Sequence, residues 1–139
     1  MSTPAGYSGT PLPAKLGIKP GYAVALVGAP PGFRQLLGEV PGAELLDGLP
    51  SNGEVLDVIV YFTTSRAEYA AELSTLRAHM APACGLWIAW PKRAAKVPTD
   101  MTEHVMREVA LPTGLVDNKV CAIDQVWTAM RLVIRVELR

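Results

Sequence analysis

Three stretches of the chain are apolar at nearly every position, and they limit the folds open to it more than any other feature. They are YAVALVG (22–28), VLDVIVYF (55–62) and GLWIAW (85–90). A strand with one face in water alternates apolar and polar residues, whereas a strand covered by helices on both faces is apolar throughout. The pattern therefore predicts parallel strands buried between two layers of helices.

Two segments between and after these strands have the features of helices. Ser65 and Glu68 have the spacing of a capping box, in which each residue bonds the backbone amide of the other. An apolar stripe follows at helical spacing: Tyr69, Leu73, Leu76 and Met80. Asp100 and Glu103 repeat the capping-box spacing. The helix that they open is expected to be buried through Met101, Val105 and Val109.

Shorter elements complete the first half of the chain. Thr10 is expected to cap a short helix that ends before Gly17, and a second short helix should run from Pro31 to Gly38. The stretch AELLDG (43–48) predicts a weak strand. Residues 1–21 are thus interpreted as a flexible arm with one short helix, followed by a single domain over 22–139.

The last two strand-like runs are LVDNKVCAID (115–124) and AMRLVIRVEL (129–138). A connection of about four residues is too short for a parallel crossover, so the two runs should pair antiparallel. The order of elements predicts a three-layer α/β, Rossmann-like domain whose mostly parallel sheet has about six strands and ends in an antiparallel pair. Arg131 and Arg135 alternate with apolar residues in the last run, which predicts a half-exposed strand that offers an interface.

The stretch LGIKPGYAVALVG (16–28) resembles the turn and first strand of class I methyltransferases, which bind S-adenosylmethionine on a Rossmann-like sheet. LRAHMAPACGLWIAW (76–90) is similar to their helix, Pro-Gly turn and later strand. The reversed last strand also matches, so the resemblance implies a methyltransferase-like topology. LGIKPG, WPK and the RLVIR that follows Trp127 also resemble a bacterial family of small proteins of unknown function, which implies no activity.

The chain departs from the methyltransferases where their glycine-rich loop would hold the cofactor. In GAPPGF (28–33), Gly28 is in place, but Pro30 occupies the next glycine position and Pro31 follows, so two amides that could bind a ligand are lost. Asp47 stands where an acidic residue of that family binds ribose hydroxyls, although it also suits a turn before Gly48. We therefore expect no cofactor, with S-adenosylmethionine as the alternative.

Motifs of other chemistries are missing from the sequence. It contains no GxSxG, HExxH, CxxC or Walker A spacing. His79 and His104 fall on different predicted helices and are interpreted as surface residues, while Cys84 and Cys121 have the apolar neighbours of reduced core thiols. We therefore predict no metal site and no catalytic residue.

A ligand site is expected at the carboxyl ends of the strands, where ligands bind to open parallel sheets. The candidates at this edge are Gly28, Pro30, Thr63, Thr64, Ser65, Trp90, Lys92, Arg93, Asp124 and Trp127. Each has a structural alternative: Ser65 and Asp100 can serve only as helix caps, and Lys92, Arg93 and Lys96 can form a solvated loop. Trp87 and Trp90 are an odd number of residues apart, so they should face opposite sides of their strand.

The charge and the hydropathy of the chain limit the classes of partner that it is expected to bind. The 13 basic and 13 acidic residues cancel, which disfavours nucleic acid. No apolar run approaches the length of a membrane span or a signal peptide, so we expect a cytoplasmic protein that does not enter membranes. The leading hypothesis is a non-catalytic domain that binds a protein partner or forms a homo-oligomer. The alternative is a small-ligand binder or a degenerate S-adenosylmethionine-dependent transferase.

Overall fold

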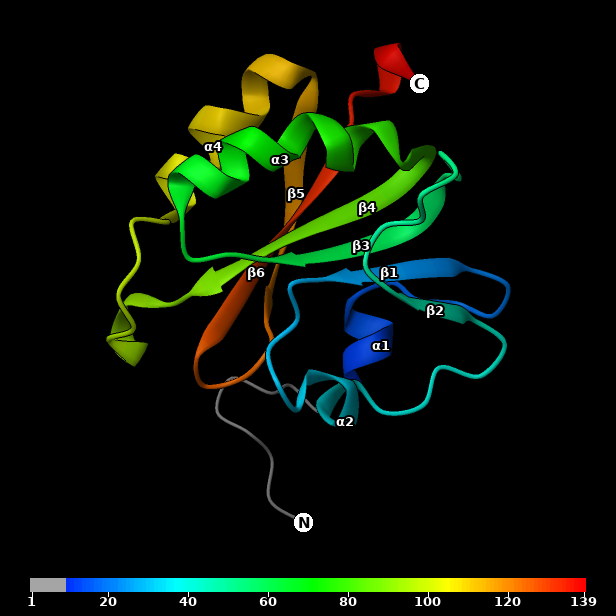
Figure 1. The fold of residues 1–139 in the computed structure, drawn as a ribbon, viewed down its shortest axis with the longest axis horizontal. Coiled ribbons are helices and arrows are strands. Elements are labelled where there is room, and N and C mark those ends of the chain that lie inside the picture. Colours follow the sequence, from blue (N-terminus) through cyan, green and yellow to red (C-terminus); the bar gives the residue numbers. More distant parts are fainter. Residues whose placement is uncertain (1–9) are drawn as a thin grey trace.

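The computed structural model describes residues 10–139 and has a central six-stranded sheet in the order β2-β1-β3-β4-β6-β5 (Figure 1). The strands are β1 (Ala23–Val27), β2 (Glu44–Asp47), β3 (Leu56–Phe62), β4 (Met80–Pro91), β5 (Leu115–Ala122) and β6 (Trp127–Ile134). β1 to β4 are parallel, and β6 runs antiparallel to both of its neighbours, β4 and β5. The predicted mostly parallel sheet with a terminal antiparallel pair is confirmed.

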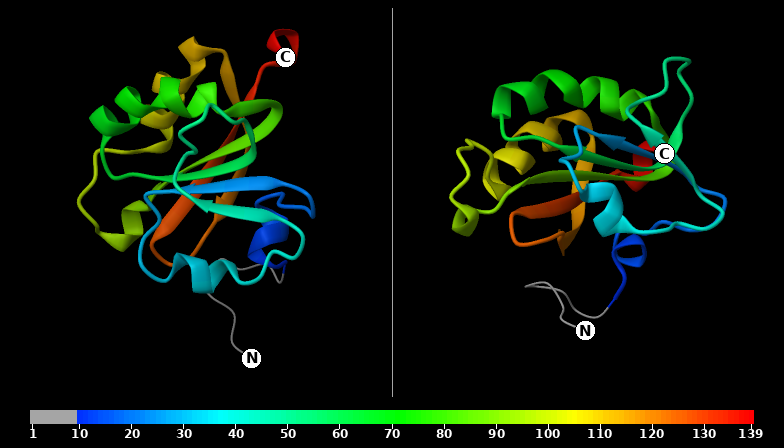
Figure 2. Two further views of the ribbon diagram at one scale, coloured as in Figure 1. Left: turned by 45° about the vertical axis from the view of Figure 1, so that its right-hand side comes forward. Right: turned by 60° about the horizontal axis from the view of Figure 1, so that its bottom comes forward.

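Helices cover both faces of this sheet, as Figures 1 and 2 show. The short helices α1 (Leu12–Lys15) and α2 (Phe33–Leu37) lie on one face, here called the α1 face. The longer helices α3 (Arg66–Ala78) and α4 (Glu103–Ala110) lie on the other, the α3 face. This is the predicted three-layer arrangement. The part of the predicted arm before residue 10 lies outside the described residues.

The pleat of the strands divides the core into two layers, and the tryptophans of β4 illustrate it. Trp87 packs with α1 and α2, and its indole Nε1 donates a hydrogen bond to the carbonyl oxygen of Leu16 at 3.0 Å. Trp90 packs on the α3 face with Met101. The prediction that the two side chains face opposite sides is confirmed.

The start of α3 follows the capping prediction only in part. Ser65 Oγ accepts a hydrogen bond from the backbone amide of Glu68 at 3.1 Å, as predicted. The carboxylate of Glu68 does not reach back to Ser65, because it accepts a hydrogen bond from the hydroxyl of Thr63 at 2.8 Å. Tyr69, Leu73 and Leu76 of the predicted stripe are buried against the sheet, whereas Met80 is not in the helix, because α3 ends at Ala78 and Met80 begins β4.

The start and the buried side of α4 differ from the prediction. Thr102 rather than Asp100 is the cap, and its Oγ1 accepts from the amide of Val105 at 3.1 Å. Met106 and Ala110 are buried, whereas the predicted Val105 and Val109 are only partly buried. The buried stripe lies one residue later than predicted, which turns the helix by about 100° because it has 3.6 residues per turn.

Two short helices also begin later than expected, and one strand ends earlier. Pro11 precedes α1 without a side-chain cap, so Thr10 does not cap it. α2 begins at Phe33 rather than at Pro31, and Gly32, with a φ of 87°, precedes it. β6 ends at Ile134, and Val136–Leu138 form a 3₁₀ turn. Within residues 10–139, no helix combines the length and the hydropathy that a membrane span requires.

Candidate functional site

The carboxyl ends of β1, β3 and β4 meet at one edge of the sheet, here called the rim (Figure 1). β6 is antiparallel, so its first residue, Trp127, pairs with Pro91 at the end of β4. The turn between β5 and β6 therefore lies at the same edge of the sheet as the loops that follow the parallel strands. These are the segments that the sequence placed at the predicted ligand edge.

The loop after β1 is closed against the sheet. Gly28 has a φ of 70°, and a Cβ at this position would lie 3.0 Å from the carbonyl oxygen of Phe62. The carbonyl oxygen of Pro30 accepts a hydrogen bond from the amide of Phe33 at 3.1 Å, so the loop turns directly into α2. Pro30 and Pro31 have no amide hydrogen to offer a ligand.

The acidic residue at the end of β2 is already paired. Asp47 Oδ1 lies 3.3 Å from Arg34 Nη2, and the same nitrogen donates to the carbonyl oxygen of Leu45 at 3.3 Å. Arg34 belongs to α2, so this contact joins the helix to the sheet edge. Both side chains are largely exposed, and such a pair contributes little to stability.

Aromatic rings occupy the rim on the α1 face. Phe33 meets Phe62 edge to face with ring centroids 4.8 Å apart, and Phe62 meets Trp127 in the same way at 5.2 Å. The three residues, here called the aromatic trio, connect the start of α2 to the start of β6 across the end of β3. Phe33 and Phe62 are buried, so the trio forms part of the core.

The hydroxyl-bearing residues after β3 serve the start of α3. Thr63 is buried, and besides its bond to Glu68 its Oγ1 accepts from the amide of Ser65 at 3.1 Å. The hydroxyl of Tyr61 also donates to Glu68 Oε1, at 3.3 Å, and burial raises the pKa of Tyr61 well above its ordinary value. Ser65 thus has the capping role that was the alternative to ligand binding, and Thr63 supports the same start of α3.

A cavity of about 680 Å³ opens beside the end of β4, and we call it the rim cavity. Its apolar floor comes from Trp90, Pro91 and Met101, all of which are buried. Lys92 and Arg93 also line it. A volume of this size is within the usual range for small-molecule sites.

The other charged groups of the rim cavity have partners on α4. Glu103 Oε2 lies 2.8 Å from Arg107 Nη1, and His104 Nε2 lies 3.1 Å from Glu108 Oε2. Because Arg107 balances the charge of Glu103, the net charge facing the cavity comes from Lys92 and Arg93, which favours an anionic group in a ligand.

Hydrogen bonds fix the loops around the rim cavity. Thr99 Oγ1 donates to the carbonyl oxygen of Thr64 at 2.6 Å and accepts from the amide of Met101 at 3.0 Å. The amide of Lys92 donates to the carbonyl oxygen of Val126 at 2.8 Å. Asp124 Oδ1 accepts from the amides of Val126 and Trp127 at 2.8 and 2.7 Å, so Asp124 stabilises its own turn.

The structure thus separates the predicted ligand residues into groups. Trp90, Lys92 and Arg93 share the rim cavity. Trp127 belongs to the aromatic trio, beside the loop that contains Gly28 and Pro30. The remaining candidates hold local structure: Thr63, Thr64, Ser65 and Asp124.

Several residues of the rim cavity were not predicted as site residues. They are Val97, Thr99, Met101, Thr102, Glu103, His104 and Thr128. Glu103 was interpreted as part of a capping box and His104 as a surface residue, because their spacing carries no sign that the preceding loop folds back beside β4. The signals in the sequence that pointed to this cavity were the predicted strand end at Trp90 and the basic residues Lys92 and Arg93 that follow it.

The two arginines predicted as interface residues occupy different surroundings. Arg131 is half-buried on the α1 face of β6, directly opposite Trp87 and Lys119 on the neighbouring strands. Arg135 follows β6 and is exposed, with its Nη1 3.9 Å from Glu137 Oε1. Neither position establishes a partner.

The fold is that of class I methyltransferases, as comparisons with solved structures show. The chain is similar to a S-adenosylmethionine-dependent methyltransferase from Aquifex aeolicus, with 15% identity, a TM-score of 0.58 and 87% of each chain covered. A putative type 11 methyltransferase from Sulfolobus solfataricus aligns with 11% identity, a TM-score of 0.63 and 90% of each chain. No protein-family model and no curated protein matches the sequence.

A third similar structure contains the cofactor. It is the magnesium protoporphyrin IX methyltransferase from Synechocystis with bound S-adenosylmethionine, at 12% identity and a TM-score of 0.57. The alignment covers 83% of this chain and 71% of that one. At such identities the similarity establishes the fold and leaves the chemistry to the residues present.

Those residues do not fit S-adenosylmethionine in the way that the resemblance implies. The loop after β1 contains two prolines in succession, the carboxylate of Asp47 is paired with Arg34, and the aromatic trio fills the adjoining rim. None of these residues lines the rim cavity, whose floor is at the end of β4. Only Trp127 is next to it, because it pairs with Pro91. The open space and the expected cofactor position therefore do not coincide.

Proposed function

We propose that this protein is a non-catalytic, methyltransferase-like domain that binds a small ligand in the rim cavity. The observation that carries the proposal is the combination of the apolar floor of Trp90 and Met101 with the cations Lys92 and Arg93. A ligand that suits these walls has an apolar body and one anionic group. The altered loop after β1 supports the absence of methyl transfer from a cofactor bound in the usual position.

The proposal is tested by thermal unfolding of the full chain with S-adenosylmethionine, nucleotides and acyl-CoA as probes. A ligand at 100 times its dissociation constant adds about 2.7 kcal/mol to the free energy of unfolding, which is a readily measured shift. Lys92→Ala should abolish the shift. Lys96→Ala should preserve it, because Lys96 is a cation of the same loop that does not line the rim cavity.

The outcomes separate the alternatives. A shift with acyl-CoA or a nucleotide that depends on Lys92 supports the rim cavity as a ligand site. A shift with S-adenosylmethionine that is lost in Asp47→Ala and kept in Lys92→Ala would instead support a degenerate transferase and contradict the proposal. No shift with any probe would also count against it.

Self-association is the second candidate function, and the free edge of β5 favours it. β5 ends the sheet, and Val120 in this strand is 63% exposed. Leu138, which is 53% exposed, lies near Gly114 at the start of the same strand. An uncovered strand edge with apolar side chains can pair with the same edge of a second copy of the chain.

Light scattering and sedimentation over a concentration series test this candidate. A dimer formed through β5 should weaken in Val120→Lys, because two lysines would then face each other across the new strand pair. Val55→Lys is the matched control, since Val55 is 51% exposed and precedes β3 rather than lying on the edge strand. A strict monomer at all concentrations would contradict self-association.

A further inference from the structure

We propose that the α1 face carries a second site, distinct from the rim cavity, that binds a small phosphate-bearing anion. A pocket of about 290 Å³ lies between α1 and the sheet, and we call it the basic pocket. Its charged lining residues are Lys15, Lys19, Lys119 and Arg131 with a single carboxylate, Asp57. Four cations against one anion leave a net charge of plus three around this small volume.

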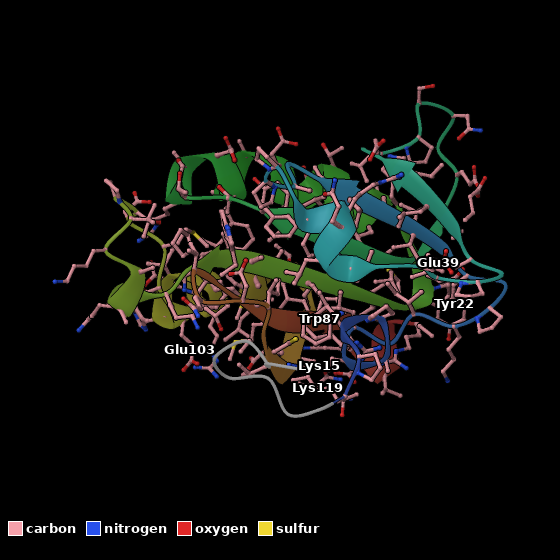
Figure 3. The ribbon with its side chains drawn as sticks, turned by 90° about the horizontal axis from the view of Figure 1, so that it is seen from below. Lys15, Tyr22, Glu39, Trp87, Glu103 and Lys119 are labelled. Atoms are coloured by element: carbon pink, nitrogen blue, oxygen red, sulfur yellow. The ribbon has the colours of Figure 1, made fainter. Side chains whose placement is uncertain are left out.

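Strand pairing brings the cations together. Arg131 of β6 pairs with Trp87 of β4 on one side and with Lys119 of β5 on the other. Directly paired residues project from the same face of a sheet, so Arg131 and Lys119 lie on the α1 face beside the buried Trp87. Figure 3 shows Lys119 next to Lys15 and near Trp87, with Tyr22 farther along the same pocket.

Arg131 is held against the sheet before any ligand arrives. A Cβ at position 85 would lie 2.5 Å from Arg131 Nε and 3.2 Å from its Cζ, so the guanidinium lies on strand β4 where Gly85 leaves room. No bulkier residue could occupy this place without moving the arginine. A side chain that is already ordered loses less conformational entropy on binding, which increases affinity.

Two cations of the basic pocket, Lys119 and Arg131, are not neutralised by ion pairs with described residues. Among residues 10–139, the ion pairs closer than 4.0 Å include neither Lys119 nor Arg131. Asp57 Oδ2 accepts a hydrogen bond from the backbone amide of Ala23 at 2.9 Å, so this carboxylate holds β1 in place. The pocket therefore attracts an anion from solution.

The size and chemistry of the basic pocket favour phosphate. The planar guanidinium of arginine binds phosphate through two parallel hydrogen bonds, and lysines add charge without fixed geometry. The volume suits a phosphate group with a small organic part, for which Tyr22 and Trp87 supply apolar wall. A polymer would find too little concave surface here.

Isothermal titration calorimetry on the full chain at constant ionic strength tests the proposal. The probes are inorganic phosphate, pyrophosphate and glucose 6-phosphate, with citrate as a carboxylate of similar charge. We expect binding of at least one phosphate probe, and at least tenfold weaker binding in Arg131→Gln and in Lys119→Gln. Arg135→Gln is the matched control and should bind as the unaltered chain does, because Arg135 does not line the basic pocket.

Gly85→Ala adds a variant that removes no charge. The new methyl group should displace the guanidinium of Arg131. If the position of this guanidinium is important for affinity, phosphate binding should then become weaker. If this variant does not fold, Arg131→Lys replaces it, since it keeps the charge but loses the planar donor pair and should bind between the unaltered chain and Arg131→Gln.

Three outcomes would overturn the proposal. The first is that no phosphate probe binds at concentrations on the order of 10 mM, because binding weaker than this does not indicate a specific site. The second is citrate binding as tightly as the phosphate probes. The third is binding that survives Arg131→Gln but is lost in Lys92→Ala, which would place the anion in the rim cavity and support that site instead.

Discussion

The carboxylate of Asp100 accepts a hydrogen bond from the backbone amide of Arg66 at 2.7 Å, so a residue of the loop before α4 caps the first turn of α3. Thr99 in the same loop donates to the carbonyl oxygen of Thr64, just before α3. These two contacts fix the loop that forms one wall of the rim cavity. The same residues thus stabilise a helix and shape the cavity.

Replacing Asp100 by alanine should lower the free energy of unfolding by about 1 kcal/mol, the usual cost of removing a helix cap. Asp100→Asn should retain most of the stability, because its amide oxygen can also accept the hydrogen bond. Urea unfolding at neutral pH measures the difference. Glu72→Ala, an exposed acidic position in the middle of α3, is the control, and an Asp100→Ala variant as stable as this control would contradict the capping role.

Gly28→Ala should destabilise the protein more than Gly17→Ala. Both glycines have a left-handed φ, 70° and 77°, so alanine at either position costs about 1 to 2 kcal/mol of backbone strain. Only at Gly28 would the new Cβ also press on the carbonyl oxygen of Phe62, at 3.0 Å, whereas nothing lies within 4 Å of it at Gly17. Equal losses in denaturant titrations of the two variants would show that the contact with Phe62 is unimportant.

The buried thiols should be unreactive in the native protein. Burial raises the pKa of Cys84 to about 12 and also raises the pKa of Cys121, and only the thiolate is an efficient nucleophile. Dithiobis-nitrobenzoate should therefore label both cysteines slowly at neutral pH and fully in guanidinium. Rapid labelling of the native chain would contradict the burial of these side chains.

The same shift makes stability fall in alkali. A raised native pKa means that the thiol of Cys84 stabilises the fold fully below the ordinary thiol pKa of about 8.5, and that this contribution is lost as pH rises towards 12. Unfolding free energies measured between about pH 8 and pH 10 should decline, and Cys84→Ala should decline less steeply. If the unfolding free energies of the unaltered chain and of Cys84→Ala decline equally with pH, groups other than Cys84 cause the decline.

Acid should weaken the contact between α3 and α4. The guanidinium of Arg66 hydrogen-bonds the carboxylate of Glu108 and lowers its pKa, with a smaller effect from His104. The stabilisation is therefore present above the ordinary carboxyl pKa and is lost as pH falls through the lowered value. Glu108→Gln should flatten the acid side of a melting-temperature profile, and added salt should reduce the difference, since this pair is exposed.

The sheet could be predicted from the sequence because its evidence is local. Strands covered on both faces are apolar at nearly every position, and the short link between β5 and β6 permits only antiparallel pairing. The odd spacing of Trp87 and Trp90 fixed their opposite directions in the same way. Each of these features depends on neighbouring residues along the chain.

The candidate site could be predicted only in part, because most of it is assembled by contacts between distant segments. Trp90, Lys92 and Arg93 were identified since they lie at the end of a predicted strand or directly after it. Asp100 has the correct spacing to cap α4, yet it caps α3, which is 34 residues earlier in the chain. No pattern of nearby residues distinguishes these two uses of one carboxylate.

The basic pocket shows the same limit. The alternation of polar and apolar residues around Arg131 indicated a half-exposed strand. The position of its guanidinium, however, depends on the absence of a side chain at Gly85, which is on another strand. Gly85 has no left-handed φ that would mark it as a turn residue. Its importance becomes apparent only when β4 and β6 are paired.

Trp87 and Trp90 face opposite layers of the core, and this gives the protein an internal pair of optical reporters. The indole of Trp87 donates a hydrogen bond to the carbonyl oxygen of Leu16, next to α1, whereas Trp90 forms part of the floor of the rim cavity with Met101. Because the chain has a third tryptophan, Trp127, variants that replace it and keep only one of these two would report separately on the melting of each layer. The two halves of the core can therefore be followed independently during unfolding, although a single strand connects them.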